Sequence, residues 1–338
     1  MIYLDHAAAT PPLTEAIAAL INAPQGNPNS THAAGEAARN ALGEALTTIA
    51  RCIGVKSGDI HLFPTATAAA QTAIYSCYAA GYAGQRNATE HHSILESTYI
   101  QRYVMQNTAA TGRFFVAQML ANNETGEIYG KPDLNSGDLW LCDATAALGH
   151  IPVDVKQLGC DYLIGDALKF GGIPGAAFLY VKPGAPFFPL IEGGTPPVAL
   201  ACAMAAALEW HVEHMAENCA KINSCMDKLY GILTRSVPDL VLNSPRLTMA
   251  HMLNVSFPGV DGKALALMLS KRGVMVSAGA ACTSGNNEPS HVLMAMYGDE
   301  NRARSAIRIS LSHENTAEEC EQAAKIIADC VQTLREIG

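Results

Sequence analysis

The sequence predicts an α/β fold in which a large domain, with a mostly parallel sheet between helices, is joined to a smaller α+β domain. Short apolar runs alternate with helical stretches over the first two-thirds of the 338 residues, as in parallel sheets whose strands are connected by helices. Two of these runs, FFVAQML and AAFLYV, are apolar nearly throughout, which is typical of strands covered on both faces. After Pro197 the alternation changes to a mixed pattern.

The helical stretches repeat apolar residues at three- and four-residue spacing. In the first part we predict helices over Pro12–Ala23, Ala34–Ile53, Thr67–Ala80 and Ser93–Gln106, and strands over Ile60–Phe63, Arg113–Met119, Leu139–Cys142, Tyr162–Ile164 and Ala176–Val181. The second part is predicted to contain a helix over Val198–Met215, a second helix to Ser236, strands in MLNVSF, VMVSAG and AIRISLS, helices at Gly262–Arg272 and from Pro289, and a terminal helix that opens with the capping box Thr316–Glu319. We therefore expect a large domain over residues 12–215 and a small domain formed by residues 1–11 and 216–338.

Composition excludes several classes of function. The chain has 22 basic and 31 acidic residues, a net charge of −9, which argues against a nucleic-acid groove. No apolar window is long enough for a membrane span, and the first residues lack the pattern of a signal peptide. The ten cysteines include no CxxC pair, so we expect reduced thiols, no metal site and a cytoplasmic protein.

Lys169 and Asp143 are the first candidates for chemistry. Each follows a short apolar strand, the place where open α/β sheets carry functional groups. An acid at the end of a strand as apolar as LWLCD is costly unless it pairs with a cation. The alternatives are a surface lysine and an acid that caps the following helix.

Three further segments could contribute side chains to the same site. His91 begins a predicted helix, where it could stack on a cofactor or cap the helix, and the adjacent His92 leaves open which ring faces inward. Asn123 follows a strand end in good turn composition. Ala66 and Thr67 open a helix whose free N–H groups suit a phosphate.

In the smaller domain, Cys282 lies among small and polar residues, so its thiol is a candidate nucleophile. Arg308 alternates with apolar residues on a predicted strand. It could bind a carboxylate with two hydrogen bonds, or it could face solvent at a strand edge.

In six motifs the chain resembles the cysteine desulfurases, which are pyridoxal-phosphate (PLP) enzymes of fold type I in the class-V aminotransferase group. IYLDHAAATPP is similar to the family's YLDxAATTP, GNPNSTHAAG to GNPSSxHxxG, TEHHSIL to TEHxAVL and NNETGEI to NNExGxxQ. CDATAALGHIPVDVKQLGCDYL resembles VDAxQxxGKxPxDVxxLxVDxx, and SAGAACTSGNNEPSHVL resembles SSGSACTSxxxEPSxVL of the longer-loop branch. Six motifs in the same order run from end to end of the chain.

The resemblance implies a PLP-binding large domain, a small domain that carries the Cys282 loop, and a role for each matching residue. Lys169 would bind PLP covalently and act as a base, Asp143 would pair with the pyridine nitrogen, His91 would stack on the ring, Asn123 would bond its hydroxyl side, and Ala66 and Thr67 would hold the phosphate. Thr195 would reach the phosphate of the partner subunit in a homodimer, and Arg308 and Asn27 would bind the substrate carboxylate. Cys282 would take sulfur from L-cysteine as a persulfide, release L-alanine and pass the sulfur to a protein acceptor such as an iron–sulfur scaffold.

The chain departs from the family pattern around the cofactor. Ala146 stands where the family has a glutamine, and Asp166 and Leu168 stand where it has serine and histidine before the lysine. EGGT, with Glu192, replaces RSGT, and the Gly-rich segment before it is missing. An anion beside a phosphate is repulsive, so Asp166 must point away or be compensated by a cation.

Two other functions are compatible with these residues. A selenocysteine lyase or another PLP-dependent β-lyase would use the same lysine, aspartate and arginine without needing Cys282. A non-catalytic scaffold of the same fold is a weaker alternative, because such a protein has no special reason to retain Lys169.

Overall fold

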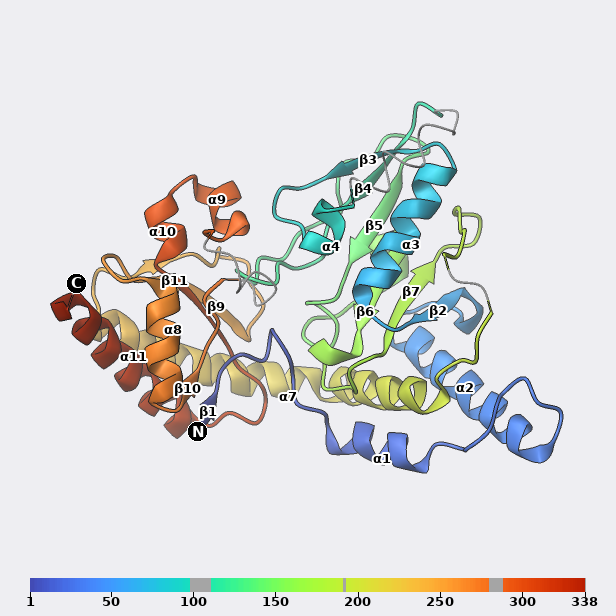
Figure 1. Ribbon diagram of the computed structural model, residues 1–338, viewed down its shortest axis with the longest axis horizontal. Helices are drawn as coiled ribbons and strands as arrows, with labels where there is room; N and C mark the ends of the chain where they lie inside the picture. Colours follow the sequence, from blue (N-terminus) through green and yellow to red (C-terminus); the bar gives the residue numbers. More distant parts are fainter. Residues whose placement is uncertain (98–110, 191–192, 280–287, 338) are drawn as a thin grey trace. The chain divides into compact units, whose positions relative to one another are not determined.

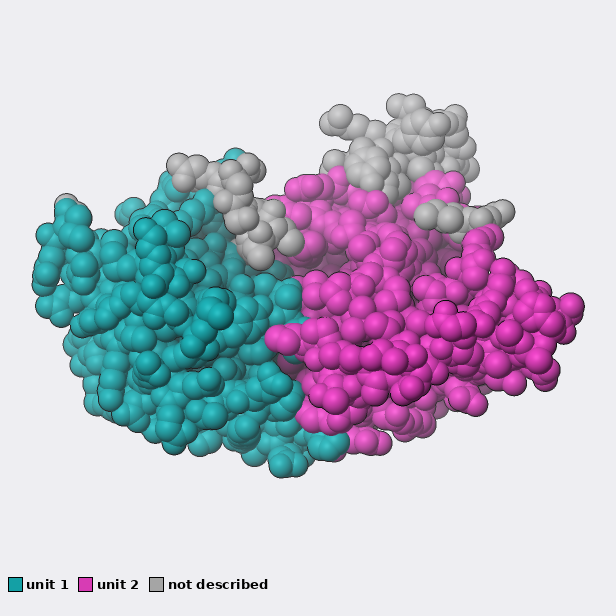
Figure 2. Space-filling view, turned by 60° about the horizontal axis from the view of Figure 1, so that its bottom comes forward, with its two compact units in different colours: residues 1–10, 121–128, 214–338 teal, residues 11–120, 129–213 magenta. Residues whose placement is uncertain are grey.

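The computed structural model describes residues 1–97, 111–190, 193–279 and 288–337, which form two compact units (Figures 1 and 2). The larger unit comprises residues 11–120 and 129–213, and the smaller unit comprises residues 1–10, 121–128 and 214–338. The smaller unit is therefore assembled from three separate stretches of chain.

A six-stranded sheet with the order β2-β7-β6-β5-β4-β3 forms the centre of the larger unit. The strands are β2 (Ile60–Phe63), β3 (Ala83–Arg86), β4 (Phe114–Ala117), β5 (Leu139–Asp143), β6 (Tyr162–Asp166) and β7 (Ala177–Val181). The pairs β3–β4, β4–β5 and β5–β6 are parallel, which confirms the predicted mostly parallel sheet. β7 runs antiparallel to both of its neighbours, β2 and β6. For β6 the reason is the connection over residues 167–176, which is too short for a parallel crossover.

Helices cover this sheet, and small residues let α3 pack closely on it. The helices of the larger unit are α1 (Thr14–Asn22), α2 (Ala33–Cys52), α3 (Ala66–Ala79), α4 (His92–Leu95), α6 (Val155–Leu158), the short 3-10 helices η1 (Ser57–Asp59) and η3 (Ala167–Lys169), and the first part of α7 (Val198–Ser236). Ala69 and Ala73 of α3 are fully buried in one core with Leu141 and Ile164 of the sheet. Side chains this small allow the helix axis to approach the strands closely (Figure 1).

The long helix α7 corrects one prediction. We expected two helices, one to Met215 and one to Ser236, and the structure has a single helix of 39 residues. No glycine or proline interrupts the chain between Val198 and Tyr230, so nothing breaks the ladder of backbone hydrogen bonds. Although α7 is long, neither it nor any other described helix is apolar enough to cross a membrane.

The smaller unit contains two small sheets and a helical layer. β1 (Ile2–Tyr3) pairs in parallel with β10 (Val274–Met275), and β11 (Ala306–Ser310), β9 (Met252–Ser256) and β8 (Val241–Leu242) form an antiparallel sheet. The helices are α8 (Gly262–Lys271), α9 (His291–Tyr297), α10 (Glu300–Arg304), α11 (Ala317–Ile337) and the rest of α7. The predicted capping box is present, because Thr316 N–H donates to Glu319 Oε2 and Glu319 N–H donates to Thr316 Oγ1, each at 3.2 Å.

Residues 121–128 belong to the smaller unit, although the sequence analysis places them within the large domain. Asn122 Oδ1 accepts from the N–H groups of Glu124 and Thr125, at 2.9 Å each, and so closes a tight turn. The Nδ2 group of Asn254 on β9 donates to the carbonyl of Glu124 at 3.1 Å. These buried hydrogen bonds hold the turn on the β11-β9-β8 sheet.

Candidate functional site

The carboxyl ends of β2, β5 and β6 lie at one edge of the larger unit's sheet. β5 and β6 are parallel, and β2 has the direction of β6 because both are antiparallel to β7 between them. Phe63 at the end of β2 and Asp166 at the end of β6 both pair with Ala177 of β7. The segments that follow these strand ends therefore emerge close together, at the edge where α/β sheets carry ligand sites.

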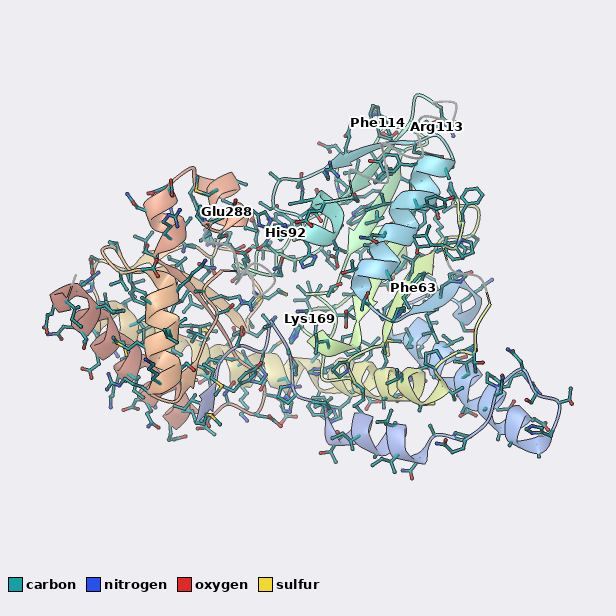
Figure 3. The ribbon with its side chains drawn as sticks, viewed as in Figure 1. Phe63, His92, Arg113, Phe114, Lys169 and Glu288 are labelled. Atoms are coloured by element: carbon teal, nitrogen blue, oxygen red, sulfur yellow. The ribbon has the colours of Figure 1, made fainter. Side chains whose placement is uncertain are left out.

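Lys169 is the last residue of η3, which follows β6 directly (Figure 3). Asp166 caps η3, because its Oδ1 accepts from the N–H of Leu168 at 3.0 Å. The carbonyl of Lys169 lies 3.2 Å from Nε2 of His150, and since a carbonyl only accepts, Nε2 carries the proton. These contacts fix the backbone from which the Lys169 side chain extends.

His150 is a residue that the sequence analysis did not select. Burial lowers the pKa of His150 to about 4, although the hydrogen bond to the Lys169 carbonyl acts in the opposite direction. The imidazole is therefore neutral at pH 7 and donates from Nε2. Its position in the segment that follows β5, close in sequence to Asp143, was the available signal.

Asp143 is the last residue of β5 and is only 8% exposed. Its Oδ1 accepts from the N–H of Thr145 at 2.9 Å and so shapes the turn that follows, whereas the alternative interpretation expected it to cap a helix. Within the described part of the chain it forms no ion pair. The hydroxyl of Thr145 is also buried, without a hydrogen-bond partner among the described residues.

A buried acid connects His91 to this edge. Glu90 is fully buried, its Oε1 accepts from the N–H of Met119 at 2.9 Å, and the next N–H, that of Leu120, donates to the carbonyl of Asp143 at 2.8 Å. Burial raises the pKa of Glu90 to about 8, while the Met119 bond lowers it and Asp143 raises it further. The sequence analysis missed Glu90, although it stands directly before His91.

His91 caps helix α4, which is the second of its two sequence interpretations. Its Nδ1 accepts from the N–H of Ser93 at 3.1 Å and lies 2.8 Å from Ser93 Oγ. In the neutral ring the proton is therefore on Nε2. The neighbouring His92 is engaged differently, since its Nδ1 pairs with Glu96 at 3.0 Å. Ser93 thus fixes the orientation of the His91 ring.

Asp166 lies at the N-terminus of α3, where the sequence analysis placed a phosphate. Its Oδ2 accepts from the N–H of Ala66 at 3.2 Å. The N–H of Ala68 donates to Thr65 Oγ1 at 3.1 Å, whereas the N–H of Thr67 has no acceptor among the described residues. The carboxylate neither points away from the helix nor pairs with a described cation; backbone N–H groups stabilise it.

Two other predicted residues of the larger unit come together at its surface. The Nδ2 group of Asn27 lies 3.4 Å from Thr195 Oγ1, and both residues are exposed. Asn27 Oδ1 accepts from the N–H of Asn29 at 2.9 Å, which fixes the orientation of the Asn27 amide.

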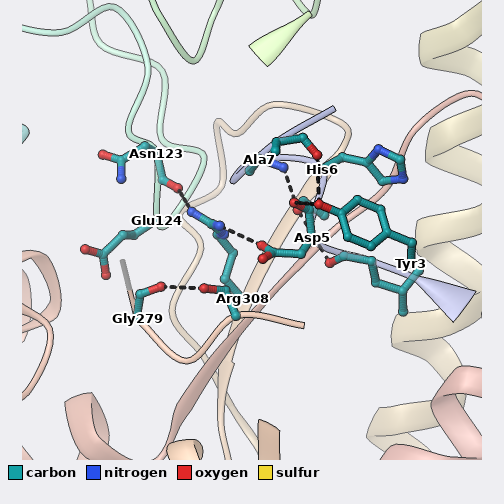
Figure 4. A network of polar contacts seen from close by, with 12 residues as sticks. Tyr3, Asp5, His6, Ala7, Asn123, Glu124, Gly279 and Arg308 are labelled. Carbon is teal, nitrogen blue, oxygen red and sulfur yellow. Dashed lines mark hydrogen bonds and ion pairs between the residues drawn. The ribbon is translucent and has the colours of Figure 1, made fainter. Parts of the chain in front are cut away.

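In the smaller unit, Arg308 on β11 is only 2% exposed, so it is not a solvent-facing arginine at a strand edge (Figure 4). Its Nη2 pairs with Asp5 Oδ1 at 2.8 Å, and its Nη1 donates to the carbonyl of Asn123 at 2.7 Å. Its Nε is buried without a partner among the described residues. Arg308 therefore retains donor capacity while Asp5 and Asn123 hold its guanidinium in place.

The segment that leads toward Cys282 is anchored on Arg308. The main chains of Ser277 and Arg308 exchange two hydrogen bonds, of 2.7 and 3.1 Å, and Ser277 Oγ donates to the carbonyl of Gly279. Ser290 caps α9 and donates to the buried carboxylate of Glu124 at 2.5 Å. Cys282 itself, like Glu192, lies outside the described residues.

The residues of the larger unit fit the ring of PLP better than its phosphate. The buried carboxylate of Asp143 suits a protonated pyridine nitrogen, and the orphaned hydroxyl of Thr145 could hydrogen-bond to a ring substituent. At the start of α3, by contrast, Asp166 already accepts the hydrogen bond of the Ala66 N–H, which is then not available to a phosphate.

Comparisons with known proteins identify the family of this chain. The family model described as Aminotransferase class-V matches residues 100–187 and 186–323. "Cysteine desulfurase IscS" of Dictyoglomus turgidum is 31% identical over 378 residues, which cover 100% of this chain and 96% of the relative. "Cysteine desulfurase" of Cereibacter sphaeroides is 32% identical, with 100% of this chain and 97% of the relative covered.

Solved structures show the same fold. A structure titled "NIFS-LIKE PROTEIN" has a TM-score of 0.86 and 27% identity, and covers 98% of this chain and 99% of its own. The NifS-like protein from Rickettsia africae has a TM-score of 0.84 at 23% identity, with 98% and 99% covered. The likeness extends over nearly the whole of each chain.

Proposed function

Because this chain belongs to the cysteine desulfurase family of the class-V aminotransferases, whose members depend on PLP, we propose that it converts L-cysteine to L-alanine and retains the sulfur on Cys282. One observation carries the proposal. Asp143 is the last residue of β5, and Lys169 lies three residues after the end of β6, the adjacent parallel strand. A lysine that can bind an aldehyde and an acid that can hold a ring proton are the two protein groups that PLP chemistry requires.

PLP, when bound, withdraws electrons from the substrate's α-carbon. In our proposal Lys169 holds the cofactor and then moves protons at the α-carbon. With PLP bound, Asp143 would keep the pyridine nitrogen protonated, and His91, whose imidazole is oriented by Ser93, would cover the cofactor ring. The burial of Asp143 supports its role, because a buried carboxylate favours a neighbouring cation.

Arg308 is proposed to bind the carboxylate of the substrate, with Asn27 as a further contact, while Asn123 bonds to the cofactor's hydroxyl side. Three features of Arg308 support this role: its guanidinium is buried, it is oriented by Asp5, and its Nε–H donates to no described partner. A preoriented guanidinium loses little entropy when it binds a carboxylate.

The sulfur-transfer step assigned to Cys282 needs no external oxidant. The Cys282 thiolate attacks Sγ of the substrate, the Cβ–Sγ bond breaks and an S–S bond forms. The electron pair of the broken bond stays on the carbon skeleton, which takes up protons and leaves as L-alanine. Thiol and cysteine thus give persulfide and alanine, so oxidation of the sulfur is balanced by reduction of the carbon.

Three of the described thiols, those of Cys52, Cys77 and Cys320, are poor alternatives to Cys282. Burial raises the pKa of Cys52 to about 11 and the pKa values of Cys77 and Cys320 to about 12. A thiol with so high a pKa is almost entirely protonated at pH 7, and the thiolate is the nucleophile.

The test is to incubate the purified full chain with PLP and L-cysteine and to measure alanine, persulfide and visible absorbance. We expect bound PLP to absorb visibly, alanine to form, and mass spectrometry to find an additional sulfur on Cys282. Cys282→Ala should abolish the persulfide, whereas Cys202→Ala, a change within an alanine-rich helix, should not. A protein that stays colourless with PLP would contradict the proposal, and undiminished alanine formation by Cys282→Ala would indicate a β-lyase instead.

We further propose a cytoplasmic homodimer in which Thr195 reaches the phosphate of the partner subunit and a protein such as an iron–sulfur scaffold accepts the sulfur. None of the nine cysteines of the described part forms a disulfide, an arrangement compatible with a reducing compartment. The names of several relatives are those of cysteine desulfurases, which supports sulfur transfer as the biological role.

A further inference from the structure

We infer that Asp166 determines how this chain binds its cofactor. Its carboxylate occupies the start of α3, and so the protein binds the phosphate of PLP more weakly than it binds the remaining part of the cofactor. This inference rests on the proposed function, since it concerns the PLP site. It predicts an enzyme that distinguishes PLP poorly from pyridoxal, the same aldehyde without a phosphate.

The geometry fixes the position of the carboxylate. Asp166 is the last residue of β6, and its register partner Ala177 is also the partner of Phe63, the last residue of β2. The side chain at position 166 is therefore held next to the segment that leads from β2 into α3. Its Oδ2 accepts from the Ala66 N–H at 3.2 Å, and its Oδ1 accepts from the Leu168 N–H at 3.0 Å.

These two bonds use both carboxylate oxygens for structural purposes. One oxygen caps η3, whose last residue is Lys169, and the other satisfies the first N–H of α3. Turning the side chain away would leave the Leu168 and Ala66 N–H groups without this acceptor. The carboxylate is thus built into the local fold and is not a mobile surface charge.

A phosphate would meet a less favourable environment here than at an ordinary helix start. The first turn of a helix attracts an anion through its unsatisfied N–H groups and its dipole. Here Ala66 and Ala68 already donate to side-chain oxygens of the chain itself, and the dipole acts on a carboxylate. A phosphate would lie beside a like charge, with the N–H and the hydroxyl of Thr67 as the donors of that turn that no hydrogen bond among the described residues uses.

Among the described residues, no lysine, arginine or histidine forms an ion pair with Asp166. Serine, which the family carries at this position, is neutral and can donate from its hydroxyl, whereas an ionised aspartate only accepts. The substitution therefore changes both the charge and the hydrogen-bonding direction at one point of the site.

The test compares PLP with pyridoxal in equilibrium titrations of the full-length apoprotein, followed by tryptophan fluorescence and visible absorbance. Asp166→Asn keeps the size of the side chain and an oxygen for the Leu168 N–H, and removes the charge. We expect it to raise the affinity for PLP about tenfold or more, equal to about 1.4 kcal/mol, and to change the affinity for pyridoxal less than about threefold. Asp166→Ser should act in the same direction.

Asp154→Asn is the matched control. Asp154 caps α6 of the same unit, where its Oδ1 accepts from the N–H groups of Lys156 and Gln157. Its replacement removes an equal charge from a similar structural position and should leave both affinities unchanged. Borohydride reduction and peptide mapping will show whether each aldehyde is attached to Lys169.

The outcomes separate the inference from the proposed function. Equal PLP affinities of the wild-type and Asp166→Asn proteins would overturn the inference alone, as would a wild-type protein that prefers PLP over pyridoxal by more than about 100-fold. That second measurement needs no variant, so it decides the matter even if the variants fail to fold. Absence of any aldehyde attachment to Lys169 in all of the proteins would overturn both.

Discussion

The neutral ring of His150 donates from Nε2 to the main-chain carbonyl of Lys169, 3.2 Å away, and so links the segment after β5 to the lysine that follows β6. Burial lowers the pKa of this histidine to about 4, below its ordinary value near 6.5. The unfolded chain therefore binds a proton at a pH where the folded protein does not, and stability falls as the pH is lowered from about 6.5 to about 4.

We predict that His150→Gln removes this part of the pH dependence. The glutamine amide can still donate to the carbonyl but does not titrate, so the variant should lose up to about 3 kcal/mol less stability than the wild-type protein between pH 6.5 and pH 4. Urea unfolding at several pH values measures the difference. His32→Gln, on the larger unit's surface, serves as a control, and parallel curves for wild type and His150→Gln would contradict the prediction.

Glu90 gives the wild-type protein a pH dependence of stability opposite in sign to that of His150, and Glu90→Gln should remove it. Burial raises the pKa of Glu90 to about 8, so the folded protein holds a proton that the unfolded chain loses near pH 4.5. This contribution to stability is complete below pH 4.5 and is lost as the pH rises through 8. The glutamine variant keeps an acceptor for the Met119 N–H, and we expect it to be more stable at pH 8 by at most about 5 kcal/mol.

Thermal and urea unfolding of Glu90→Gln at pH 5 and pH 8 will check this expectation. Glu96→Gln is the matched control, because Glu96 is exposed and pairs with His92 at the surface. If Glu90→Gln is no more stable than the wild-type protein at pH 8, then Glu90 is ionised in the folded state and the expectation is wrong.

Arg308→Lys should raise KM for L-cysteine about 100-fold and affect kcat much less. A lysine keeps the positive charge but has no planar pair of donors for a carboxylate. Steady-state alanine formation measures both constants. Arg304→Lys, at a surface pair with Glu300, should match the wild-type enzyme. A loss confined to kcat would mean that Arg308 does not bind the substrate carboxylate.

Thr316→Ala should destabilise the protein by about 1 kcal/mol, because the N–H of Glu319 loses its acceptor. Differential scanning calorimetry should record a melting temperature lower by about 2 °C. The control is Thr333→Ala in the same helix, where the hydroxyl only bonds back to the carbonyl of Asp329 and alanine favours the helix. A shift equal in the two variants would exclude a capping effect.

Periodicity predicted most of the fold because burial imposes it directly. β2 was predicted to the residue, and β7 within one residue, since apolar runs in a covered sheet have few alternatives. β3 was missed because AGQR has no strand signal of its own. Only glycine fits at position 84 of this strand, because a Cβ there would clash with the Tyr78 hydroxyl and the Phe115 ring.

The division of α7 into two helices was wrong for an instructive reason. Its alanine-rich first part belongs to the larger unit, whereas its later part carries charged residues and belongs to the smaller unit. The pattern changes because the surroundings of the helix change, and the backbone continues without a break. A hydrophobic pattern reports burial, and only indirectly where a helix ends.

The site could be predicted as residue types but not as contacts. Lys169, Asp143 and Arg308 were selected from the sequence, and the structure adds the partners that orient them. Asp166 was recognised as a departure from the family pattern, but its hydrogen bond to Ala66 could not be predicted. The two residues are 100 positions apart in sequence, and they meet only because β2 and β6 pair with β7 in a particular register. Local sequence carries no such information.

The assembly of the smaller unit from three stretches sets an order of events during synthesis on the ribosome. Leu4 pairs through its main chain with Met275 and with Ser310. At 5–20 residues per second, roughly 15–60 s pass between the emergence of the first strand and that of β11. The larger unit can be completed once residue 213 has emerged, while the first ten residues wait. The Asp5–Arg308 pair is therefore among the last contacts to form, and a nascent chain released before β11 would carry Lys169 without its carboxylate-binding arginine.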